Sequence, residues 1–239
     1  MGRCSALTSV TRNKCRLLTL VFLVFFFFLI ISLFSTTKPP PESKGPWYHF
    51  PAPCRLNDSD MNDLNALLVK THSALESLHV PHALCYGTLW GALRQGRILP
   101  WDNNVDFCAL DSHFVNASSS QLKDAFAERN LVIEYDWRRG VYDVSLLQGK
   151  VLGHIYVFTT SIMRGENELH LAMPGGWMNK MRRRFGHKQV SFPVWLLKEP
   201  FEATKVNGVD VPVPHDGIEM LKYLYPDDWW LELKPPGCV

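Results

Sequence analysis

An uncharged run near the N-terminus is the feature that most constrains what this chain can fold into. Residues 17–34 read LLTLVFLVFFFFLIISLF and contain no charged side chain. As an α-helix this run would be about 27 Å long, close to the roughly 30 Å hydrocarbon core of a bilayer. A cleaved signal peptide would have a shorter apolar region followed by a small-x-small site, and Ser32-Leu33-Phe34-Ser35 is a poor cleavage site. We therefore expect an uncleaved transmembrane signal-anchor.

The charges around this run predict its orientation. Arg12, Lys14 and Arg16 directly precede it, and basic flanks stay in the cytosol. Residues 1–16 are then a cytosolic tail, 17–34 the anchor of a single-pass type II protein, and the remainder lumenal. Residues 1–41 hold five of the 25 basic side chains and none of the 23 acidic ones, so the rest carries a net charge of −3. This mildly acidic body predicts no nucleic-acid partner.

Two further features fit a lumenal location in the Golgi or ER. Asn57-Asp58-Ser59 and Asn116-Ala117-Ser118 are N-glycosylation acceptor triplets. Four cysteines fall in the lumenal part, where disulfides form: Cys54, Cys85, Cys108 and Cys238. Four cysteines allow three pairings, and the sequence does not choose among them.

The lumenal part divides into a stem and one domain. Residues 35–56 form a proline-rich stem of extended or polyproline conformation, and residues 57–239 form the domain. Apolar periodicity predicts a long helix that starts at 59 or 60 and ends before Pro81, and helices over 89–95, 119–129 and after Asp216. Strands are expected over 83–86, 105–110, 131–135, 141–147 and 153–159, with a looser segment over 161–214. This order predicts an α+β fold, a small mixed sheet flanked by helices.

A glycine turn between the first strand and its helix predicts a phosphate site. The backbone N–H groups exposed by Gly87 at a helix start suit an anion. Thr88 adds a hydroxyl donor, and Arg94 has the guanidinium that pairs with phosphate oxygens. These three residues are the predicted binding site for donor phosphates.

A polar sequence then opens the next strand. Asn104 and Asp106 are two apart, so both side chains should lie on one face of the strand. Asp102 lies just before them. Carboxylates of this kind bind Mg²⁺, which prefers oxygen ligands. We predict Asp102, Asn104 and Asp106 as the catalytic group, with Asp102 and Asp106 as metal ligands.

Residues 87–106 as a whole resemble the signature of the LicD/fukutin family, within the polymerase-β-like nucleotidyltransferase superfamily. The family pattern is roughly G-[ST]-L-L-G-A-x-R-x-G-x-x-[IL]-P-W-D-x-D-[IV]-D. The resemblance implies a nucleotidyltransferase-like sheet and a Golgi or ER membrane enzyme. It also implies a CDP-alditol or CDP-choline type donor and Mg²⁺, with transfer of the phosphorylated group to a hydroxyl of a glycan or glycoprotein. The matches are Gly87, Thr88, Leu89, Gly91, Ala92, Arg94, Gly96, Leu99, Pro100, Trp101, Asp102, Val105 and Asp106.

Two departures from the family pattern leave three interpretations open. Asn104 stands where the family has the first Asp of Asp-x-Asp, and Tyr156 stands where its later His-[IV]-Asp-[ILV] strand has the third acid. Asp143, on an adjacent predicted strand, is a candidate to compensate, whereas His154 is interpreted as structural. One interpretation is an active Mg²⁺-dependent phosphotransferase. The other is a catalytically degenerate protein that binds a glycan or a partner, and a purely structural lumenal domain is a third.

Overall fold

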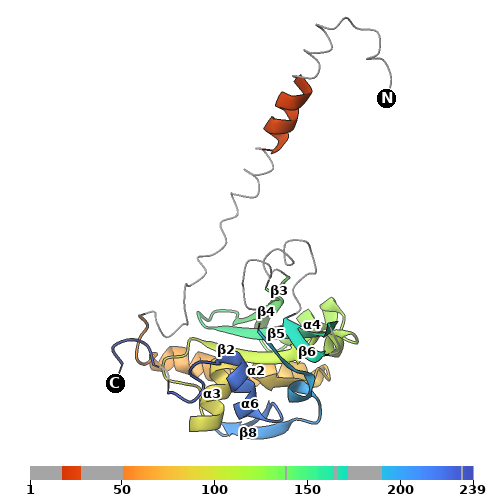
Figure 1. The fold of residues 1–239 in the computed structure, drawn as a ribbon. Coiled ribbons are helices and arrows are strands. Elements are labelled where there is room, and N and C mark those ends of the chain that lie inside the picture. Colours follow the sequence, from red (N-terminus) through yellow and green to blue (C-terminus); the bar gives the residue numbers. More distant parts are fainter. Residues whose placement is uncertain are drawn as a thin grey trace, which may run out of the picture. The chain divides into compact units, whose positions relative to one another are not determined.

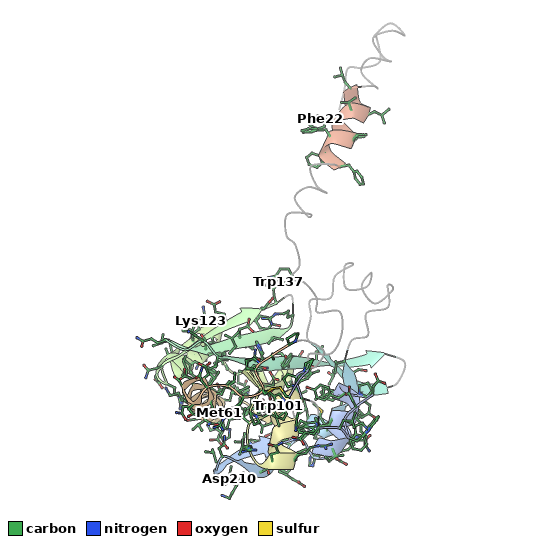
Figure 2. The ribbon with its side chains drawn as sticks, turned by 90° about the vertical axis from the view of Figure 1, so that its left-hand side faces the viewer. Phe22, Met61, Trp101, Lys123, Trp137 and Asp210 are labelled. Atoms are coloured by element: carbon green, nitrogen blue, oxygen red, sulfur yellow. A yellow bond between two sulfur atoms is a disulfide. The ribbon has the colours of Figure 1, made fainter. Side chains whose placement is uncertain are left out.

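The computed structural model describes residues 18–27, 51–137, 139–163, 166–171, 190–232 and 234–238. The chain divides into two compact units, Met1–Trp47 and Tyr48–Val239. In the first unit residues 18–27 are helical, and their apolar side chains, including Phe22, are exposed around the helix (Figure 2). No helix among the described residues is both long and apolar enough to cross a membrane. Residues 28–34 of the predicted anchor and 35–50 of the predicted stem lie outside the described residues.

The second unit is an α+β domain built on a mixed sheet. The described strands form one sheet in the order β1-β2-β5-β4-β3, extended by β6 on β5 and by β7 on β6. Only the β2–β5 pair is parallel among these described pairs, and the others are antiparallel. The strands are β1 (His82–Leu84), β2 (Asn104–Leu110), β3 (Leu131–Asp136), β4 (Val141–Leu146), β5 (Leu152–Met163), β6 (Glu166–Leu171) and β7 (Ser191–Pro193).

Helices cover this sheet, and a small hairpin lies beside it. Helix α2 packs on β5 closely enough that a methyl group at Gly153 would lie 3.4 Å from Leu67. Helices α3 and α6 lie side by side (Figure 1). The helices are α2 (Asp58–Ser77), α3 (Tyr86–Gln95), α4 (Ser119–Ala127) and α6 (Gly217–Leu224), with 3₁₀ turns η2 (Asp111–Phe114) and η3 (Val194–Leu197); the hairpin is β8 (Glu202–Val206) and β9 (Val209–Val213).

Helix α2 forms where its apolar stripe and cap predict it. Asn57 caps the helix, its side-chain oxygen accepting the Asp60 N–H at 2.8 Å, and the stripe that includes Leu64 and Leu75 is fully buried. The helix ends at residue 77, short of Pro81, because His79 takes a left-handed φ of 51° and the Val80 N–H bonds back to Leu75. The amide of Asn57 also donates to Asp60 at 2.8 Å.

The segment over 161–214 is more ordered than the sequence predicted. Strand β5 continues to Met163, and β6, β7, β8 and β9 all fall within this segment. The β8–β9 turn is Asn207-Gly208, with φ of 50° and 86°, and Asn-Gly between apolar residues is a strong hairpin signal. The prediction of a loose segment was therefore wrong for these strands.

The four cysteines that follow the predicted anchor form two disulfides. Cys54 pairs with Cys238, and Cys85 pairs with Cys108. The first bond joins the two ends of the domain, and the second joins the start of α3 to β2. The fold thereby selects one of the three pairings that the sequence left open.

Candidate active site

The glycine turn is fixed to strand β2 by backbone hydrogen bonds. The Cys85 N–H donates to the Asp106 carbonyl at 3.1 Å, and the Asp106 N–H donates to Thr88 Oγ1 at 2.9 Å. Tyr86, between them, has a left-handed φ of 50°. Thr88 is fully buried, so its hydroxyl positions the turn against β2.

Asn104 and Asp106 lie on one face of β2, as predicted. Asn104 Nδ2 donates to Asp106 Oδ1 at 2.6 Å. Asp106 is only 5% exposed. Burial, and next the negative charge of Asp102, raise the pKa of Asp106 well above its ordinary value, while the hydrogen bond from Asn104 acts to lower it. The amide nitrogen of Asn104 thus takes the place beside Asp106 that a second carboxylate would fill.

Asp102 lies against the glycine turn. A methyl group at Gly87 would be 2.9 Å from Asp102 Oδ2 and 3.1 Å from Oδ1. Oδ2 is buried and has no hydrogen-bond partner among the described residues. Burial raises the pKa of Asp102 from 3.8 to about 7. Asp102 and Asp106 are therefore two neighbouring carboxyl groups with raised pKa values, and no basic side chain in the described ranges forms an ion pair with either of them.

Tyr156 lies on the same face, one strand away. The parallel register pairs Asp106 with His154 and Cys108 with Tyr156, and alternate residues of paired strands share a face. The Tyr156 ring lies on Tyr86, with centroids 4.4 Å apart. Burial and the charge of Asp106 raise the Tyr156 pKa, so its phenol stays protonated and neutral.

His154 and Asp143 form a pair that the sequence did not predict. The antiparallel β4–β5 register places them opposite each other, and His154 Nδ1 lies 2.9 Å from Asp143 Oδ1. Arg139 holds the other carboxylate oxygen and also donates to Asp136 at 2.8 Å. Burial lowers the pKa of His154, and this effect outweighs the opposite effect of Asp143. Asp143 is thus engaged by His154 and Arg139, which argues against its compensating for Asn104.

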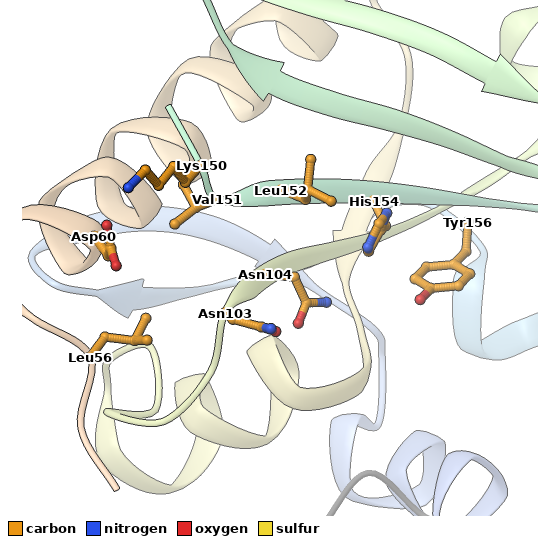
Figure 3. A pocket seen from close by; sticks show the side chains of 9 residues that line it. All are labelled: Leu56, Asp60, Asn103, Asn104, Lys150, Val151, Leu152, His154 and Tyr156. Atoms are coloured by element: carbon orange, nitrogen blue, oxygen red, sulfur yellow. The ribbon is translucent and has the colours of Figure 1, made fainter. Parts of the chain in front are cut away.

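A pocket of about 320 Å³ opens beside this face. Figure 3 shows Asn104, His154 and Tyr156 along one side of it, and Asp60 and Lys150 at the other end. Its lining combines one acid and one lysine with neutral hydrogen-bonding groups and aliphatic side chains. The lining residues are Leu56, Asp60, Asn103, Asn104, Lys150, Val151, Leu152, His154 and Tyr156.

Arg94 has a different environment from the one predicted. Its guanidinium donates to the carbonyls of Trp229 and Trp230, the latter at 3.2 Å, and stacks 4.3 Å from the ring centroid of Trp90. This arginine fastens the C-terminal segment to α3, and the structure does not bring it to Asp106. The phosphate-binding prediction for Arg94 therefore receives no support from the geometry.

The two glycosylation triplets also differ in setting. Asn116 is exposed after η2. Asn57 is exposed too, but its side chain already caps α2 through both its oxygen and its amide. Of the two predicted N-glycosylation acceptors, Asn116 is therefore the one whose side chain is less constrained by hydrogen bonds.

The donor atoms around Asp106 fit Mg²⁺ in one particular way. The described residues contain no group of three or more His, Cys, Asp or Glu that could hold a metal. Mg²⁺, however, is commonly bound by one or two carboxylates together with substrate phosphates. The unpartnered Oδ2 of Asp102 beside the Asp106 carboxylate supplies such a pair. The site fits a cation that is shared with a bound phosphate, not one caged by protein ligands alone.

A match to a family model identifies the class of this domain. A family model described as "LicD/FKTN/FKRP, nucleotidyltransferase domain" matches residues 79–216. This is more than half of the chain, and the chain belongs to this family. Among solved structures, ANT(2")-Ia in complex with adenylyl-2"-tobramycin is similar at 14% identity and a TM-score of 0.41, over 68% of this chain and 75% of that chain. No curated protein matches the chain.

Proposed function

We propose that this protein is a glycan-modifying transferase of the LicD type. It would move a phosphorylated alditol or choline-like group from a CDP-activated donor to a hydroxyl of a glycan or glycoprotein. The observation that carries the proposal is the Asp102–Asp106 pair beside the start of α3, because ionising these carboxyl groups requires a counter-ion that no described side chain supplies. A donor arriving with a divalent cation would supply one.

Each residue around this pair has a distinct task. Asp102 and Asp106, with the amide oxygen of Asn104, would hold Mg²⁺, which when bound supplies neutralising charge to the donor phosphates. The first N–H groups of α3 receive no side-chain cap from Cys85, and a helix start of this kind favours an anion. Thr88 holds this helix start against β2.

The proposal includes a place in the cell. We propose a single-pass type II protein of the Golgi or ER membrane whose domain is lumenal. The two disulfides support an oxidising compartment, and the exposed Asn116 triplet fits the same compartment. Protease protection in sealed microsomes, with an epitope at each end of the chain, tests the topology. Protection of the N-terminal epitope would contradict it.

One observation favours a second function, binding without transfer. The Asn104 amide nitrogen faces Asp106 at 2.6 Å, and a protonated phenol stands at Tyr156. Both replacements remove negative charge from positions where the family pattern has acids. A chain of this kind would retain the pocket and bind a glycan or a partner without metal chemistry.

Calorimetry separates these two functions. The full-length chain in detergent is titrated with CDP-ribitol, CDP-choline and CDP, each with and without Mg²⁺, and with Mg²⁺ alone. A transferase is expected to bind a donor only with Mg²⁺, and Mg²⁺ alone only weakly. Asp106→Asn should weaken this binding at least a hundredfold, whereas the control Asp210→Asn, at an exposed surface pair with Lys205, should not change it. Donor binding that does not depend on Mg²⁺, or the absence of donor binding, supports the second function.

A further inference from the structure

We infer that the pocket beside Asn104 binds a neutral sugar or alditol residue and that His154 Nε2 accepts a hydrogen bond from one of its hydroxyl groups. The inference deepens the proposed function. The assignment of the bound sugar as the acceptor of the transfer rests on that function. The inference assigns His154 and Asp143 a role in the site, whereas the sequence indicated a structural histidine. Four observations carry this inference.

The first observation is the orientation of the imidazole. Because Asp143 is a carboxylate at 2.9 Å, His154 Nδ1 must donate the hydrogen of that bond. In a neutral ring, Nε2 then carries the free lone pair. Arg139 fixes Asp143 from the other side, so the ring is held in one orientation. No hydrogen-bond partner of Nε2 is found in the described part of the chain.

The second observation is where the ring lies. His154 belongs to the pocket lining, with a side chain 15% exposed. Figure 3 shows it between Asn104 and Tyr156. The Tyr156 ring stands edge-on to it at 6.0 Å. A hydroxyl group in the pocket therefore has access to a fixed acceptor nitrogen.

The third observation is the chemistry of the lining. Asn103, Asn104 and Tyr156 provide neutral donors and acceptors, and Val151 and Leu152 provide aliphatic surface. Sugars present hydroxyl groups at their edges and C–H groups on their faces, so they require this mixture. The one acid and one lysine at the mouth leave the lining without net charge, which suits a neutral ligand better than a nucleotide. The volume, about 320 Å³, is at the small end for ligand pockets.

The fourth observation is the neighbouring carboxylate pair. His154 is the register partner of Asp106 across the parallel β2–β5 pair. A hydroxyl at Nε2 is thus next to the strand where the donor phosphate is proposed to bind. In transfer, the hydroxyl oxygen bonds to the donor phosphorus, its proton passes to Nε2, and the phosphorus–oxygen bond to CMP breaks with its electron pair leaving on CMP. Asp143 would stabilise the imidazolium that forms.

The test uses sugar alone, without donor or Mg²⁺. Ribitol and methyl β-galactoside are titrated into the full-length chain, with binding followed by saturation-transfer NMR and His154 by its imidazole ¹⁵N signals. The free protein should show an Nδ1–H tautomer with an unprotonated Nε2. At least one probe should shift the Nε2 signal. A different tautomer, or binding that leaves Nε2 unmoved, would overturn the inference.

Variants locate the binding. Leu152→Trp fills the pocket from its rim, where Leu152 is 45% exposed, and Leu147→Trp is a matched control at a 65% exposed leucine outside the lining. Leu152→Trp and His154→Phe should each weaken binding at least tenfold, and Leu147→Trp should not. Asp143→Asn should change the tautomer ratio of His154, because it removes the carboxylate that accepts the Nδ1 hydrogen. Sugar binding unaffected by Leu152→Trp would contradict the pocket assignment.

The outcome is independent of the donor experiment. If the chain binds sugar but shows no Mg²⁺-dependent donor binding, the proposed transferase function is contradicted and the pocket assignment is retained. Donor binding with no sugar bound by either probe, on the other hand, removes the pocket and keeps the transferase.

Discussion

The two halves of the site contrast sharply. In the α3–β2 half, the glycine turn, Thr88 and Asp106 are joined by backbone hydrogen bonds and a disulfide. In the β4–β5 half, the antiparallel strands pair through their backbones, and the polar side chains contact each other through the His154–Asp143 bond. Gly87, Thr88 and Asp106 in the first half match the family pattern, whereas Asn104 in the first half and Tyr156 in the second depart from it.

This difference shows how the site can change without loss of the fold. Thr88 accepts the Asp106 N–H directly, and a side chain at Gly87 would collide with Asp102, so a substitution at either residue disturbs the turn itself. Tyr156 contacts another aromatic ring, and a flat ring in that place is accommodated by side-chain packing. The acids of such a site are consequently easier to replace than its glycine turn. Substitutions at Asp102, Asn104, Thr88 and Gly87 test this contrast.

Asp102→Asn should stabilise the domain at neutral pH. The pKa of Asp102 is 3.8 unfolded and about 7 folded, so the folded state holds the proton more tightly. The contribution of Asp102 to the free energy of unfolding is fully present below pH 3.8. It is lost as the pH rises towards 7, and the total loss is up to about 4 kcal/mol. In urea unfolding, the variant should therefore have a higher free energy of unfolding than the wild type at pH 7.5. At pH 4 this difference should disappear. An equal difference at both pH values would contradict the raised pKa.

Asn104→Asp should restore a second acid next to Asp106. With a CDP donor present, Mg²⁺ affinity should rise about tenfold to a hundredfold, the range for metal-site partners. Without Mg²⁺ the variant should unfold more easily, because two carboxylates would replace the hydrogen bond at 2.6 Å. Tyr156→Asp added to it should strengthen both effects. Isothermal calorimetry and urea unfolding measure them, and Asn103→Asp, at the exposed neighbouring position, is the control.

Thr88→Val removes the acceptor of the Asp106 N–H while keeping the shape of the side chain. The buried N–H would then lack a partner, at a cost of about 2 kcal/mol in the free energy of unfolding. Thr88→Ser retains the hydroxyl, so its free energy of unfolding should fall distinctly less. If both variants lose the same amount, the hydrogen bond at 2.9 Å is not what holds the turn.

Gly87→Ala should cost about 1 kcal/mol, the low end for overpacking, because the new methyl meets the end of the Asp102 side chain at 2.9 Å. The double variant Gly87→Ala/Asp102→Ala removes that collision. The two substitutions should therefore be coupled in a double-mutant cycle by unfolding free energy. Strict additivity would show that Asp102 does not lie against the turn.

Local patterns in the sequence were sufficient for much of the fold. The leucine stripe of α2, the Asp216 cap of α6 and the strands near 105–110 and 141–147 depend on neighbours along the chain. The spacing of Gly87 and Asp106 likewise placed the turn and the acid at one site. The hairpin at Asn207-Gly208 also has a local sequence signal, although it was not predicted.

Tertiary structure alone decided the remaining features, because they depend on which strands become neighbours. Alternation along β5 shows that His154 and Tyr156 share a face, but only insertion of β5 between β2 and β4 brings them to Asp106 and Asp143. The cysteine pairing has the same origin. Arg94 finds its partners more than 130 residues away, and no local pattern encodes that distance. The sequence therefore determined the family and the chemistry of the turn, whereas packing decided which acids and bases meet.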